Sequence, residues 1–331
     1  MVSRRAFLGS AMAALAPGMS WADAGNPAFL AAARHGEERF LLHGLHEDGA
    51  IAFSLPLPGR GHAAAAHPER PEAVAFARRP GTYALVIDCA AGTVLAELSA
   101  PPGHHFYGHG AFTADGAVLV TTESHIASGD GRLGFWDTAA GYRRIGAVPS
   151  GGIGPHEVIR LPGDRFAIAN GGIRTHPATE REKLNLDTMR PSLAIVDADG
   201  GALDQMRLDA DLHQNSIRHI AADAQGTVAF AMQWQGDPFE APPLLGLYRP
   251  GEAPVLLKGA ETALMRSQGY AGSVAFSGDG ARVGFTAPRG NLAVVYDAAG
   301  HGGPGGGGGG HLRHRPLCHG SYGDDRRGQN L

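Results

Sequence analysis

Cysteine and lysine are scarce in this sequence. The 331 residues include only two cysteines, Cys89 and Cys318, and only two lysines, Lys183 and Lys258. Two cysteines exclude a disulfide framework, so a large hydrophobic core must stabilise the fold instead. The chain also lacks the Cys-x-x-Cys-His sequence of covalently attached haem, and it has no zincin motif, nucleophile elbow or phosphate-binding loop.

Charge is sparse as well. Charged residues make up 18% of the chain, and 28 lysines and arginines against 32 acidic residues give a formal net charge of −4. This balance argues against nucleic acid or an acidic membrane surface as a partner. The apolar run near the N-terminus is shorter than the ~20 residues that a membrane span needs, so no span is expected.

That N-terminal run follows a twin-arginine pair. The sequence Ser3-Arg4-Arg5-Ala6-Phe7-Leu8 precedes an Ala/Leu/Met stretch, which ends in the small residues Ala22-Asp23-Ala24. These features predict a twin-arginine signal peptide over residues 1–24 and export of the folded protein to a bacterial periplasm. The alternative is a general secretory signal that contains two arginines by chance.

Glycine and proline are abundant, and long helical periodicities are absent. The 50 glycines and 22 prolines indicate many short strands joined by turns. Between Phe29 and Gly300 a unit recurs in which an apolar strand, a Gly/Asp turn, a second strand and a loop precede a third strand that usually ends in Asp. The clearest copies are residues 110–137 and 272–297, and weaker copies end at Asp88, Asp197 and Tyr248.

The repeat period predicts an all-β fold. A period of roughly 40 to 60 residues matches the four-stranded blade of a β-propeller better than a sandwich. We expect a seven-bladed propeller over residues 25–299, with six blades before Gly300 and a seventh, closed by the N-terminal strand, drawing on the region after it. The last blade is expected to be corrupted or incomplete in this chain.

The sequence changes character in the tail, residues 300–331. Five glycines at 306–310 precede a segment rich in histidine and arginine, and strand alternation is lost there. In a gene rich in G and C, such a glycine run is a tract where one base is easily gained or lost. With one permissible choice of codons for residues 311–331, a reading one base later gives a strand-turn-strand segment that begins I-C-G-I-A. We therefore hypothesise a frameshift near Gly306, against the alternative of a genuine flexible tail; resequencing the locus decides between them.

Three histidines occupy similar positions in successive repeats. His109, His156 and His219 each lie where the first strand of a repeat begins, and the first strands of a propeller line its central channel. Converging imidazoles suit a divalent transition metal, so these three residues are the candidate metal ligands. The alternative is that each histidine only bonds nearby backbone and stabilises its blade.

Other polar residues are expected near the channel. Arg218 precedes His219, and second strands end near Glu123, Asn170 and Gln233, whereas Arg174 and His176 lie in the longest loop within a repeat. Because loops on a rigid scaffold commonly bind ligands, we take these six residues as candidate ligand contacts. A lid packed by Leu184, Leu186 and Met189 is the alternative for the loop.

The sequence resembles a bacterial family of twin-arginine-exported proteins classified as a domain of unknown function, DUF1513. The resemblance spans about residues 25–297 and rests on six strings: His105–Phe112, Gly152–His156, Ala169–Pro177, Leu184–Met189, Ser216–His219 and Gln233–Gly236. It implies a seven-bladed propeller of the WD40-like, YVTN or quinoprotein-like class. Genes of the family often adjoin those of imelysin-like and dihaem peroxidase-like proteins, which implies such periplasmic partners and a link to iron handling. The family has no settled activity, and relatives continue with a D-x-C-G-I-A type strand where this chain has its tail.

Two functions of different classes follow. The first is a periplasmic binding or assembly protein with a metal or anion site at the channel. The second is an enzyme, either a metal-dependent hydrolase or lactonase or a partner subunit of a redox complex, in which Glu123 or Glu157 would be the general base for metal-bound water. No catalytic residue is assigned, and a scaffold with purely structural histidines is the third reading.

Overall fold

The computed structural model describes residues 21, 25, 27–179, 182–298 and the backbone of 313–316. Its strands form six antiparallel sheets, and within each sheet neighbouring strands are also neighbours in sequence. The strands of the first three sheets are β1 (Phe29–His35), β2 (Arg39–Leu45) and β3 (Ile51–Leu57); β4 (Gly61–Ala66), β5 (Glu72–Ala77), β6 (Tyr83–Asp88) and β7 (Thr93–Ser99); and β8 (His104–Phe112), β9 (Val118–His125), β10 (Asp130–Asp137) and β11 (Arg143–Ile153).

The other three sheets have four strands each. They comprise β12 (Pro155–Leu161), β13 (Arg165–Asn170), β14 (Ser192–Val196) and β15 (Ala202–Arg207); β16 (Asn215–Ala222), β17 (Val228–Trp234), β18 (Leu245–Tyr248) and β19 (Val255–Leu256); and β20 (Ser273–Phe276), β21 (Arg282–Ala287), β22 (Leu292–Asp297) and β23 (Arg313–Pro316). Short helical turns are η2 (Pro177–Thr179), η3 (Leu186–Thr188), η4 (Ala210–Leu212) and α1 (Glu261–Arg266). In the described part of the chain, no helix is long and apolar enough to cross a membrane.

The third strands of the repeats form where the sequence predicts them. β6, β14 and β18 are almost wholly apolar and buried, since these strands are covered on both faces by neighbouring sheets. The aspartate that ends such a strand organises the turn after it: Asp88 Oδ1 accepts hydrogen bonds from the Ala90 and Ala91 amides at 2.8 and 2.9 Å. This Asx-type turn explains why Asp recurs at the end of the repeat.

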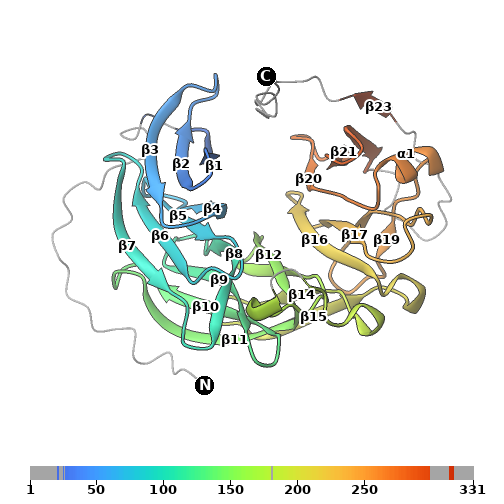
Figure 1. The fold of residues 1–331 in the computed structure, drawn as a ribbon, viewed down its shortest axis with the longest axis horizontal. Coiled ribbons are helices and arrows are strands. Elements are labelled where there is room, and N and C mark those ends of the chain that lie inside the picture. The colour runs from blue at the N-terminus through green and yellow to red at the C-terminus, as the bar shows by residue number, and fades with distance from the viewer. Residues whose placement is uncertain (1–20, 22–24, 26, 180–181, 299–312, 317–331) are drawn as a thin grey trace, which may run out of the picture.

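The six sheets follow one another around an arc, with β1–β3 and β20–β23 at its two ends (Figure 1). The first strand of each sheet contacts the first strand of the next, from β1 through β4, β8, β12 and β16 to β20. These first strands therefore lie on the inner side of the arc. Residues far apart in sequence meet there, as the sequence analysis expects.

The core consists of five apolar clusters, one in each space between consecutive sheets. The cluster between the second and third sheets includes Phe76, Phe106 and Trp136, and the cluster between the fifth and sixth includes Phe285 and Tyr296. All five are built from buried residues of two adjacent sheets. Cys89 lies in the cluster between the first and second sheets and has a free thiol. Burial is the main cause that raises the pKa of this thiol to about 12.

The structure differs from the sequence expectations at the two ends of the chain. Residues 313–316 of the tail form β23, which pairs with β22 as the fourth strand of the last sheet. β1 pairs with β2 inside the first, three-stranded sheet, which corrects the expectation that the N-terminal strand closes a later blade. The six sheets do not establish a seventh blade. Most of the predicted signal segment and the site of the hypothesised frameshift lie outside the described residues; Trp21 is described, and its Nε1 donates a hydrogen bond to the His67 carbonyl.

Candidate functional site

Four consecutive inner strands bring four imidazoles together. His62 lies on β4, His109 on β8, His156 on β12 and His219 on β16. The ring centroids of His109 and His156 are 5.4 Å apart, those of His62 and His109 4.8 Å, and those of His156 and His219 4.7 Å. We call these four residues the histidine cluster.

Each of the four strands has an irregularity in register at this level. The pairing shifts between Gly61 and Ala64 in β4, between Phe106 and Gly110 in β8, between Pro155 and Glu157 in β12, and between Ile217 and His219 in β16. A β-bulge redirects side chains and is common beside active sites. The next inner strand, β20, pairs with β21 without a shift and contributes no histidine. The bulges therefore direct these side chains into one cluster.

Glu157 is the carboxylate of the cluster. Its Oε1 lies 3.5 Å from His109 Nδ1, and its Oε2 lies 3.2 Å from His219 Nδ1 and accepts a hydrogen bond from the Ile220 amide at 3.0 Å. The cluster contains two sets of possible ligand atoms. One set is formed by His62, His109 and His156, and the other by His109, Glu157 and His219; within each set the atoms lie within 4.8 Å of one another. The two sets share His109.

Burial keeps the imidazoles of His62, His109 and His156 neutral. Desolvation is the largest cause of a lowered pKa in each of the three. The pKa of His109 is lowered, that of His156 lies well below the ordinary value, and that of His62 is lowered to about 3. Desolvation opposes ionisation of Glu157, but His109 and His219 outweigh it and lower the pKa of this carboxyl. We therefore assign an ionised Glu157 facing the protonated Nδ1 of His109, which leaves the lone pair of His109 on Nε2.

Two ring nitrogens of the cluster are buried without a partner. Within the described part of the chain, His109 Nε2 and His156 Nδ1 have no hydrogen-bond partner, and both residues are only 9% exposed. Buried polar atoms are nearly always paired, so each such atom requires an explanation. A histidine that merely bonds backbone would not leave these atoms unpaired. The arrangement suits neutral nitrogen ligands of a metal ion.

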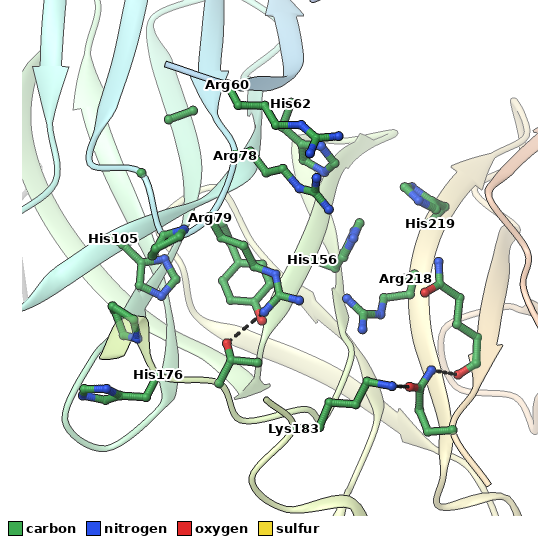
Figure 2. Close-up of a pocket in the computed structure, with 18 of the residues that line it drawn as sticks. Arg60, His62, Arg78, Arg79, His105, His156, His176, Lys183, Arg218 and His219 are labelled. Carbon is green, nitrogen blue, oxygen red and sulfur yellow. Dashed lines mark hydrogen bonds between the residues drawn. The ribbon is translucent and has the colours of Figure 1, made fainter. Parts of the chain in front are cut away.

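The histidine cluster borders a large cleft. The cleft has a volume of about 930 Å³, and His62, His156 and His219 line it, whereas His109 lies behind them. Figure 2 shows Arg60, Arg78 and Arg79 on one side of this cleft and Arg218 and Lys183 on another. We call it the central cleft.

The structure places three of the six predicted ligand contacts in the lining of the central cleft. Arg218 lies beside His156 and is 8% exposed. Gln233 donates a hydrogen bond from Nε2 to the Ala271 carbonyl at 3.2 Å, and His176 accepts one at Nδ1 from the Ala178 amide at 3.1 Å. His176 belongs to the long loop, which therefore does border the cleft.

The other three are engaged elsewhere and do not line the cleft. Glu123 is fully buried and pairs with Arg144. Asn170 is fully buried and bonds the Ser150 carbonyl at 2.9 Å. Arg174 Nη2 donates to the Ala127 carbonyl at 2.8 Å and so fastens the long loop to the β9–β10 connection. All three roles stabilise the scaffold.

His62 and most of the cations of the cleft were not predicted from the sequence. His62 precedes His109 by the same spacing that separates His109 from His156, so the repeat period itself was a signal for it. Arg78, Arg79 and Arg289 lie in connections between strands, where no pattern indicated that they face the channel.

Comparison with known families gives one match. A family model described as "Protein of unknown function (DUF1513)" matches residues 55–302. No curated protein matches the sequence.

Comparison with solved structures gives β-propeller proteins. The hydrazine synthase of Kuenenia stuttgartiensis is 12% identical with a TM-score of 0.57, over 80% of this chain and 71% of that one. A chain of the mitotic checkpoint complex is 10% identical with a TM-score of 0.52, over 78% and 68%. A chain of a nidogen–laminin complex is 12% identical with a TM-score of 0.50, over 82% and 89%. At these identities the likeness shows the fold alone: the six sheets match those of β-propellers.

Proposed function

This chain belongs to the DUF1513 family, whose description gives no function. From the residues of the chain itself, we propose that the protein is a binding protein that holds one divalent transition metal in the histidine cluster. The observation that supports this most is the pair of buried, unpartnered ring nitrogens, His109 Nε2 and His156 Nδ1, beside a third imidazole, His62. Three neutral imidazoles are a common ligand set for zinc and for other first-row metals.

Glu157 fits the role of a supporting residue. Metal-bound histidines usually direct their other ring nitrogen at a carboxylate or carbonyl, which fixes the ring and raises its basicity. His109 Nδ1 and His219 Nδ1 both face Glu157. We therefore assign His62, His109 and His156 as ligands, with His219 beside them, a change from the predicted set of His109, His156 and His219.

A binding function is favoured over a hydrolytic one because both candidate general bases, Glu157 and Glu123, already have partners. Glu157 is occupied by two imidazoles and the Ile220 amide. Glu123 pairs with Arg144 in the interior of the third sheet. A general base must be within hydrogen-bond distance of the proton it removes, and Glu123 does not border the cleft at all.

Metal titration of the full chain tests this proposal. After chelator treatment, isothermal titration calorimetry with Zn²⁺ should show one ion bound per chain, and the triple variant H62A/H109A/H156A should bind about 100-fold more weakly or not at all. Circular dichroism establishes that the variant is folded.

The tail supplies a matched control, because H311A/H314A/H319A removes the same number of imidazoles. It should leave the tight site unchanged. Tight binding that persists in the cluster variant and disappears in the tail variant would assign the metal to the tail and contradict the proposal.

The proposed place of action is the periplasm. The twin-arginine pair Arg4-Arg5 motivates this, because export of a folded chain allows the metal to be loaded before transport. In a bacterial host, R4K/R5K should leave the protein in the cytoplasmic fraction, whereas the unaltered chain is recovered from the periplasm. Equal export of the two would point to a general secretory signal instead.

A further inference from the structure

The central cleft has a strong excess of positive charge. Among the described residues, six cationic side chains line it, and none of the described lining residues is Asp or Glu. This contrasts with the chain as a whole, which has more acidic than basic residues. The six are Arg60, Arg78, Arg79, Lys183, Arg218 and Arg289. Lys183 is one of only two lysines in the protein.

Neutral groups position several of these cations. Arg79 Nη1 donates to Thr175 Oγ1 at 2.8 Å, and Lys183 Nζ donates to Gln235 Oε1 at 2.6 Å. The Arg289 guanidinium lies 4.4 Å from the centre of the Tyr270 ring. Such contacts fix the cations without neutralising them. Arg79, Lys183 and Arg289 are therefore held in the cleft by neutral partners.

Arg218 is the most constrained of the six. It is 8% exposed, and its Nε is buried without a hydrogen-bond partner. The guanidinium group of an arginine stays charged at neutral pH. A buried charge without a counter-charge is costly, which makes this position unfavourable unless an anion completes it.

We propose that the central cleft binds a small organic anion bearing two or more acidic groups, carboxylate or phosphate. Arginine forks bind both groups in bidentate geometry. Cations lie on different sides of the cleft (Figure 2), so one acidic group does not contact all of them. A volume of about 930 Å³ suits a small organic molecule. The proposal goes beyond the metal site and stands on the cleft alone.

Calorimetry on metal-free full-length protein at low salt tests the proposal. The probes are tricarballylate, a tricarboxylate that chelates metals weakly, and 2,3-bisphosphoglycerate, with the neutral trimethyl ester of tricarballylate as control. We expect at least one anion to bind, more weakly as salt is added, and the ester not to bind. The better of the two anions identifies the acidic group that the cleft prefers.

Two double variants complete the test. R79Q/R218Q should weaken anion binding about 30-fold or more, since it removes two fixed counter-charges. R143Q/R207Q removes two exposed arginines outside the cleft and should have little effect. Thermal unfolding provides a second readout, because bound anion should raise Tm in the unaltered protein and not in R79Q/R218Q.

The proposal is overturned if neither anion binds, if the ester binds equally well, or if both double variants weaken binding alike. Because the protein is metal-free in all arms, absence of the metal site would not affect these results.

Discussion

Replacing Arg144 with alanine is expected to destabilise the protein by about 3 kcal/mol, because it leaves a buried carboxylate without its counter-charge. Glu123 is fully buried in the third sheet, and Arg144 Nη2 donates to its Oε2 at 2.9 Å. Thr121 Oγ1 donates to Glu123 Oε1 at 3.0 Å and accepts from Trp136 Nε1 at 3.0 Å. The network thus joins β9, β10 and β11.

Urea unfolding of R144A measures this loss. R143A, one position away and exposed, is the matched control and should change the free energy of unfolding by less than about 0.5 kcal/mol. A double variant with apolar residues, E123L/R144M, should recover much of the stability, since it removes both charges at once. If R144A is as stable as R143A, the network is not a structural element of the blade.

Replacing Gly108 with alanine is expected to weaken metal binding about 10- to 100-fold, because the new methyl group would displace a ligand. Gly108 has a φ of 109°, and a Cβ at this position would lie 2.4 Å from His62 Cδ2. His62 must therefore shift from its place in the histidine cluster. Zinc titration of G108A by calorimetry measures the effect.

Gly103 provides the control for backbone strain. It also has a positive φ, 75°, but a Cβ there would meet nothing within 4 Å. G103A should therefore lose stability, on the order of 1 kcal/mol, and keep its metal affinity. Equal zinc affinity in G108A and the unaltered protein would show that His62 is not a ligand.

The repeat pattern was sufficient to predict the blades. Apolar third strands that end in Asp recur because each must be buried between two sheets and followed by a tight turn, and β6, β10, β14 and β22 fulfil this pattern. Pairing at the chain ends was not predictable in the same way. The segment that forms β23 has no apolar alternation, so the sequence gives no signal for its pairing with β22.

The candidate site was predictable only in part. His109, His156 and His219 were identified because inner strands converge in a propeller. Glu123 and Asn170 were misplaced, because strands such as β9 and β13 are buried on both faces and their polar residues are satisfied inside the sheet. Arg218 lies on β16 and was predicted, but the other five cations of the central cleft come from connections between strands. The course of these connections depends on tertiary packing, which the repeat pattern does not specify.

The central claim is that His62, His109 and His156 ligate one metal ion. X-ray absorption spectroscopy at the zinc edge tests it most directly, using the H311A/H314A/H319A variant loaded with one equivalent of Zn²⁺. We expect about three imidazole nitrogens at ~2.0 Å from zinc, with the remaining position occupied by an oxygen donor such as water. A first shell of oxygen atoms alone, or the same spectrum after His109 and His156 are replaced by alanine, would contradict it.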